Sequence, residues 1–195
     1  AEPLIEYVEG LVKPGRVTAK VYAGAETTNP ETTPIGEGEG YMAHTENTAY
    51  GWTAPGQSFS WGWSPAAVPW ILQNVYEAYE YSGDPALLDR VYALLKEESH
   101  FYVNYMLHKA GSSSGDRLTT GVAYSPEQGP LGTDGNTYES SLVWQMLNDA
   151  IEAAKAKGDP DGLVGDTTDC SANNWAKGDN GNFTDANANR SWSCA

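Results

Sequence analysis

The sequence predicts a mainly α-helical protein in which antiparallel helix pairs support long aromatic loops. Three segments, at about 64–82, 84–107 and 137–157, carry apolar residues at helical spacing between capping residues. The connection between the first two is only one or two residues long, which forces those helices to run antiparallel. From 41 to 63, by contrast, large rings alternate with Gly, Ser and Thr, and the breaks at Gly51, Pro55 and Gly56 exclude a single helix.

The N-terminal part is predicted to hold a helix end, a strand and a loop. Residues 2–12 place apolar side chains at helical spacing, and Pro14-Gly15 is predicted to end that helix. Residues 16–23 alternate weakly between polar and apolar side chains, which predicts a short strand. Residues 24–40 are Thr, Pro, Glu and Gly with almost nothing to bury, so we expect an exposed loop.

The aromatic stretch 41–63 has two possible roles. Loops held by a rigid scaffold often line pockets, because they can present several side chains to one ligand. Alternatively, the rings tuck under the loop as a small satellite core. The residues alone leave both open.

The three helices have clear start and stop signals. Ser64 and Pro65 read as an N-cap and first-turn pair, and Gly83 as the stop. Asp84-Pro85 then caps the second helix. The third is predicted to run from about Thr137 to Lys157.

A single carboxylate, Glu127, lies in a loop of turn-forming residues just before the third helix. Ser125-Pro126 and Gly129-Pro130 break regular structure on both sides of it. Asn136 and Glu139 stand in N-cap and N3 relation to the helix that follows. A carboxylate in a stiff loop ahead of a helix suits a catalytic acid, although the same local sequence also fits a solvated turn.

Composition excludes some partners and favours others. The formal net charge is -15, with 26 Asp and Glu against 11 Lys and Arg, and such a field repels nucleic-acid phosphates. The seven Trp and twelve Tyr argue for a folded chain with ring faces that match the apolar faces of sugars, or for ordinary aromatic packing.

The last 37 or so residues, 159–195, form a polar tail with two cysteines. A disulfide between Cys170 and Cys194 would close a loop of about 25 residues and stabilise it by roughly 3 kcal/mol, which favours an oxidising, extracytoplasmic compartment. The scattered aspartates match no calcium loop, so no metal is expected, and no cofactor motif is convincing. No stretch is long and apolar enough for a membrane span or a signal peptide, and the chain begins with Ala1, which fits removal of an upstream segment.

Several motifs resemble those of the α-L-fucosidases of glycoside hydrolase family 95. The resemblance covers 41 to about 158, and its most specific part is the Ser-Pro-Glu loop. It is carried by Tyr41-Met42-Ala43-His44-Thr45-Glu46-Asn47, Phe59-Ser60-Trp61-Gly62-Trp63, Tyr124-Ser125-Pro126-Glu127-Gln128-Gly129-Pro130, the helix pair at 70–107 and Tyr138-Glu139-Ser140-Ser141-Leu142-Val143-Trp144.

The resemblance implies part of an (α/α)6 barrel, 1–195, that inverts anomeric configuration. Residues 24–63 become a long active-site loop region, and 64–158 a helical scaffold that carries the Ser-Pro-Glu loop. Glu127 matches the family's general acid, while Glu46 and Trp61 match positions that contact the fucose. The implied substrates are fucosylated oligosaccharides or glycoconjugates with terminal α-1,2-linked L-fucose, and large bacterial cell-surface enzymes are the most similar members.

The base side of the family's site has no counterpart in the chain. The family uses asparagines before these motifs and an aspartate after them, so we expect residues 1–195 to be an excerpt that needs the rest of the parent enzyme. An alternative interpretation is a carbohydrate-binding module without catalysis, which would use Trp61, Trp63 and Glu46.

Overall fold

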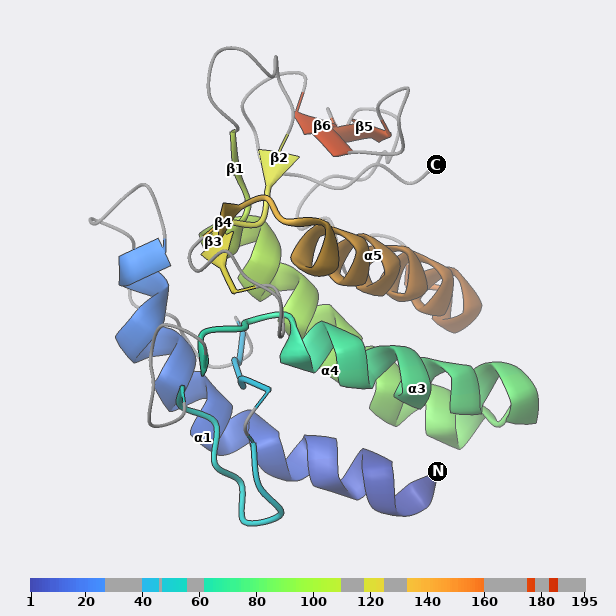
Figure 1. Ribbon diagram of the computed structural model, residues 1–195. Helices are drawn as coiled ribbons and strands as arrows, with labels where there is room; N and C mark the ends of the chain where they lie inside the picture. The colour runs from blue at the N-terminus through green and yellow to red at the C-terminus, as the bar shows by residue number, and fades with distance from the viewer. Residues whose placement is uncertain are drawn as a thin grey trace.

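The computed structural model describes residues 1–26, 40–45, 47–55, 62–109, 118–124, 133–159, 175–177 and 183–185. This part of the chain is mainly helical, and its long helices pack side by side (Figure 1). The long helices are α1 (Glu2–Glu26), α3 (Ala67–Ser82), α4 (Pro85–Phe101) and α5 (Thr137–Lys157). The predicted fold class, a mainly α protein that forms part of an (α/α)6 barrel, is confirmed.

Helices α3 and α4 form the predicted antiparallel pair. Gly83 ends α3 in the left-handed conformation at φ 63°, and its N–H bonds to the Tyr79 carbonyl. Asp84 then caps α4 by accepting a hydrogen bond from the Ala86 N–H (2.9 Å), with Pro85 in the first turn. Ser64 and Pro65 lie just outside α3, whose N-cap is Ala66, so the predicted Ser64 cap is wrong.

Replacing Asp84 with Ala is expected to lower the free energy of unfolding by about 1 kcal/mol, because the Ala86 N–H loses its acceptor. Chemical denaturation of the two proteins under one condition measures this difference. Asp84→Asn is the matched control, since Asn is an equally good N-cap. A loss as large in the Asn variant as in the Ala variant would contradict the capping role.

Helix α5 begins and ends where the sequence predicts. The Asn136 side chain accepts from the Glu139 N–H (2.9 Å), and Gly158 ends the helix at φ 70°. Its inward face packs against α3 and α4. That face buries Val143, Met146, Leu147, Ala150, Ile151, Ala153 and Ala154.

The predicted helix at 2–12 is present, but its predicted end at Pro14-Gly15 and the strand at 16–23 are wrong, because α1 continues to Glu26. The proline removes one backbone donor, but the helical face that Val8 and Leu11 bury continues beyond it with Thr18 and Ala19, which are also buried. The apolar residues that indicated a strand at 16–23, Val17 and Val21, are on the solvent side of this helix, 63% and 65% exposed.

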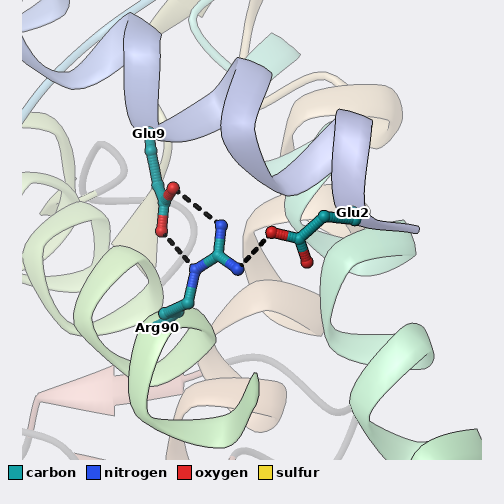
Figure 2. Close-up of polar contacts among 3 residues, drawn as sticks. All are labelled: Glu2, Glu9 and Arg90. Atoms are coloured by element: carbon teal, nitrogen blue, oxygen red, sulfur yellow. Dashed lines mark hydrogen bonds and ion pairs between the residues drawn. The ribbon is translucent and has the colours of Figure 1, made fainter. Parts of the chain in front are cut away.

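Two arginines tie α1 and α4 together. The Arg90 guanidinium donates to both Glu9 oxygens (2.7 and 2.9 Å) and to Glu2 (2.5 Å), as Figure 2 shows. These hydrogen bonds lower the pKa of Glu9 and raise that of Arg90. Arg16 makes a second paired contact with Glu97 (2.6 and 2.8 Å). Such bidentate pairs fix geometry between neighbouring helices.

The described strands form three short antiparallel pairs. They are β1 (His108–Lys109) with β2 (Leu118–Thr119), β3 (Val122–Ala123) with β4 (Thr133–Asp134), and β5 (Trp175–Lys177) with β6 (Phe183–Asp185). Figure 1 shows β3 and β4 at the end of the helical bundle where α5 begins. None of the helices described could cross a membrane.

Two predicted regions fall mostly outside the described residues. Most of the loop at 24–40 is undescribed, and its start at 24–26 belongs to α1. Within the tail, Cys170 and Cys194 both lie outside the described residues, so their disulfide stays a prediction.

Candidate functional site

The three predicted site residues, Glu127, Glu46 and Trp61, lie outside the described residues. The chain on either side of each is described, however, and these flanking segments show where the site loops start and end. The site is therefore built from His44, Trp63 and Tyr124, which stand two or three residues from the three candidates.

The loop that contains Glu127 is closed at its base by β3 and β4. Val122 pairs with Asp134 and Ala123 with Thr133 in antiparallel register. Just beyond the pair, the Asn136 side-chain amide donates to the Ala123 carbonyl (3.2 Å) while its oxygen caps α5. The ends of this loop are thus fixed to each other and to the start of a long helix.

Trp63 joins the segment after Trp61 to the segment before Glu127. Its indole Nε1–H donates to the Val122 carbonyl (2.9 Å), and its own carbonyl accepts from the Tyr124 N–H (3.0 Å). The side chain is 4% exposed. The alternative of a carbohydrate-binding module would have used the Trp63 ring to hold a glycan, and the burial of this ring speaks against that use.

His44, which lies two residues before Glu46, contacts Trp63 and the next residue, Ser64. Its Nδ1 accepts from the Ser64 backbone N–H (3.0 Å), and its ring lies 4.7 Å from the Trp63 ring, between centroids. Burial is the main cause that lowers the pKa of His44 to about 3. The imidazole is therefore neutral at physiological pH, and Nδ1 stays an acceptor.

The first turn of α5 also bonds to the chain just after Trp63, at Ser64 and Ala66. The Glu139 carboxylate, fully buried, accepts from the Ala66 backbone N–H (3.0 Å). Ser64 Oγ–H donates to the Tyr138 hydroxyl (3.1 Å). Sequence reasoning placed Glu139 at the N3 position of the helix. In the structure it reaches a segment 73 residues away.

Sequence reasoning missed another buried acid, Glu98, which lies on α4. It is 0% exposed, and neither oxygen makes a hydrogen bond within the described part of the chain. Burial, then the nearby Glu97, raise the pKa of Glu98 well above its usual value, while the Tyr41 backbone N–H acts in the opposite sense. A signal was present, because Glu98 falls on the apolar stripe of α4, between Leu95 and Tyr102.

Directly after α4 the helix widens into a π-helix, η1 (Tyr102–Met106), closed by the Leu107 N–H bonding to the Tyr102 carbonyl (2.8 Å). π-Helical turns occur often at functional sites. Tyr102 is fully buried, and burial and the nearby Glu139 raise its pKa well above the usual value. Glu98 of α4, Tyr102 of η1 and Glu139 of α5 therefore lie near one another, because each affects the pKa of a neighbour.

Replacing Glu98 with Gln is expected to make the protein progressively more stable than the parent as pH rises from 5 to 8. The folded state holds the Glu98 proton more tightly than the unfolded state, so this group favours folding below about pH 4.5 and opposes it as pH rises toward the raised pKa. Denaturation of both proteins across this pH range measures the difference. The exposed Glu77→Gln change on α3 is the control, and parallel curves for Glu98→Gln and the parent would contradict the expectation.

Other large rings in the described loops and helices are open to solvent. Tyr50 is 98% exposed, Trp52 53% and Trp70 48%. Trp70 meets Tyr138 edge to face, with 5.7 Å between ring centroids. In the aromatic stretch at 41–63, Tyr41 and Trp63 are buried, as the core alternative expected, while Tyr50 and Trp52 are exposed, and the pocket-lining role stays a prediction.

Among the described residues, no group of three or more His, Cys, Asp or Glu side chains is arranged to hold a metal ion. The chemistry that the loops and helix ends around Trp63 offer consists of carboxyl groups, aromatic rings and the neutral imidazole of His44. That set suits the recognition and hydrolysis of sugars.

Comparison with known proteins agrees with this geometry. The sequence matches the glycosyl hydrolase family 95 catalytic domain over residues 1–177. It is 30% identical over 130 residues to a probable alpha-fucosidase A of Aspergillus niger, which covers 65% of this chain and 16% of that protein. It is 25% identical over 175 residues to alpha-L-fucosidase 2 of Arabidopsis thaliana, covering 84% of this chain and 19% of that protein. The chain thus spans less than a fifth of the length of these curated relatives, and it belongs to the glycosyl hydrolase family 95 catalytic domain.

Proposed function

We propose that this chain is part of an α-L-fucosidase that removes terminal α-1,2-linked L-fucose from glycans with inversion of configuration. Glu127 acts as the general acid that protonates the departing glycosidic oxygen. Glu46 accepts hydrogen bonds from fucose hydroxyls, and Trp61 packs its ring on the apolar face and methyl group of the sugar. The names of the two relatives, both fucosidases, support the substrate class.

The observation that carries the proposal is the convergence of the three flanking segments. Trp63 is hydrogen-bonded to both Val122 and Tyr124, and Ser64 to His44. Two residues of chain reach at most about 7 Å and three about 11 Å. Glu46, Trp61 and Glu127 are only two or three residues along the chain from His44, Trp63 and Tyr124, which these contacts bring together. This closeness in the chain supports a single sugar site.

The junction also offers the environment that a general acid needs. A carboxyl group works as an acid near neutral pH when burial raises its pKa. The described residues around the base of the Glu127 loop, Trp63, His44 and Ala123, are all buried. Loss of the remaining water on sugar binding would raise the pKa of an acid at this place further.

The proposal extends to the setting of the enzyme. A partner base on the opposite face of the sugar, about 6.5–9.5 Å from the acid, is required for inversion. We propose that the remainder of the parent catalytic module supplies it. We further propose that the enzyme acts outside the cell or on a bacterial cell surface, where a Cys170–Cys194 disulfide would persist.

The direct test is to incubate the full-length enzyme with 2′-fucosyl, 3-fucosyl and 4-fucosyl glycans and follow the released sugar by proton NMR. We expect fastest release from the α-1,2-linked substrate and β-L-fucose as the first product. α-L-Fucose as the first product would contradict inversion. No release of fucose from any of the three would overturn the proposed function.

A further inference from the structure

The four residues 63–66 are held on every side by long-range hydrogen bonds. His44 and Glu139 accept the backbone N–H groups of Ser64 and Ala66. The Trp63 carbonyl and indole bond to Tyr124 and Val122. We call residues 63–66 the junction segment, because the loops on which the proposed function places Trp61, Glu46 and Glu127 all fasten to it.

We propose that His44 and Glu139 are positioning residues, which clamp the junction segment and so set the sugar-binding loops against the loop of the general acid. This inference rests on the proposed function. Neither side chain touches the sugar; each acts through the backbone N–H that it accepts. The two residues come from different parts of the chain, His44 from a loop and Glu139 from α5.

Both acceptors are placed to hold the segment rigidly. The imidazole of His44 and the carboxylate of Glu139 are 0% exposed, so water does not compete for the two N–H groups. His44 is also fixed in orientation by its contact with the Trp63 ring, and Glu139 by its place in the first turn of α5. A hydrogen bond from a backbone N–H to a carboxylate is stronger than one between neutral groups.

The clamp bears on catalysis because the positions of the sugar-binding groups decide how well the sugar is held. Displacing a positioned group by about 1 Å can lower kcat/KM by on the order of 10²-fold. The Ser64 N–H and the Ala66 N–H are two residues apart, and the segment they define leads directly to Trp61. If His44 or Glu139 no longer accepts its hydrogen bond, the junction segment can shift between α5 and the loop of His44. The proposed sugar contact of Trp61 then shifts with it.

A role confined to structure would also satisfy these N–H groups, so the variants are chosen to separate the two. His44→Asn keeps an acceptor at the position of Nδ1, and His44→Leu removes it at similar volume. Glu139→Gln keeps the oxygen that accepts from Ala66, and Glu139→Met removes it. The pairs are compared in the full-length enzyme by kcat and KM for a 2′-fucosyl glycan, with the folded fraction measured by circular dichroism.

We expect His44→Asn and Glu139→Gln to lower kcat/KM by no more than about threefold. His44→Leu and Glu139→Met are expected to lower it by about 10- to 100-fold, mainly through a higher KM, because the Glu46 and Trp61 contacts are made in the ground state. A purely structural role would lower the amount of folded enzyme and leave KM unchanged. Equal losses within each pair, or an unchanged KM in the folded Leu and Met variants, would overturn the inference.

A milder variant covers the case in which the Leu and Met proteins fail to fold. Tyr138→Phe removes only the hydroxyl that accepts from Ser64 Oγ and is expected to raise KM by about 2- to 10-fold in a folded enzyme. No change in KM would then count against the clamp. An active parent with unaffected variants overturns this inference alone, whereas a parent that releases no fucose overturns the proposed function and this inference together.

Discussion

Glu127→Gln is expected to lower kcat for release of fucose from a 2′-fucosyl glycan by about 10²- to 10⁴-fold in the full-length enzyme. Gln has nearly the same shape but cannot donate the acid proton, and general acid catalysis is typically worth that factor. The matched control is Glu152→Gln, the same change at an exposed residue of α5 that pairs with Lys155. It should leave kcat within about twofold.

The leaving group supplies a second, sharper comparison for Glu127. The leaving group of an aryl α-L-fucoside with an acidic phenol departs as a phenolate and needs little protonation. Glu127→Gln should therefore slow hydrolysis of this substrate far less than that of the glycan. A loss of similar size on both substrates would assign Glu127 to binding or to folding. Activity on the glycan within a few-fold of the parent would remove Glu127 from the mechanism.

These two substrates also separate the fucosidase from the alternative of a carbohydrate-binding module. A binding module would hold the glycan without turnover. The burial of Trp63 weakens that alternative, because it removes one of the two rings that would have formed the binding platform. The proposed site, with Trp61, Glu46 and Glu127, combines a ring with two carboxyl groups, a set that suits glycosidic bond cleavage.

Helices with strong local signals could be predicted from the sequence. The limits of α5, and the turn at Gly83 and Asp84, follow from capping side chains and left-handed glycines that act on their immediate neighbours. The length of α1 could not be predicted in the same way. Pro14 and Gly15 carry strong stop signals, but Gly15 packs closely against Tyr41 and Met42. The Met42 backbone N–H also donates to the Gly15 carbonyl, and these long-range contacts override the local signals.

The candidate site shows the same division. Turn chemistry and the resemblance to family 95 placed Glu127, Glu46 and Trp61 in loops. The residues that fasten those loops were missed, because the partners in each hydrogen bond are far apart in sequence: 20 residues for His44 and Ser64, 59 for Trp63 and Val122. Such pairs leave no local periodicity. Glu98 is the exception, since its place on an apolar stripe could have marked it as buried.

Acid is expected to destabilise the protein through His44, and His44→Asn should remove this effect. The folded-state pKa of about 3 lies below the value of 6.5 for a free imidazole. The unfolded chain therefore takes up a proton below pH 6.5 that the folded chain refuses. The stabilisation by neutral His44 is fully present above pH 6.5 and is lost as pH falls, at about 1.4 kcal/mol per pH unit.

The measurement is the free energy of unfolding of parent and His44→Asn at pH 7.5 and pH 4.5, by denaturant titration followed through tryptophan fluorescence. At pH 7.5 the parent should be the more stable, because it keeps the contact with the Trp63 ring. Between the two pH values that advantage should shrink by roughly 2 to 3 kcal/mol. Groups such as Glu98 and Asp149, whose raised pKa values act in the opposite direction, are common to both proteins and largely cancel in the difference. An advantage that stays constant with pH would contradict the prediction, because it would mean that His44 takes up its proton equally well in the folded and the unfolded protein.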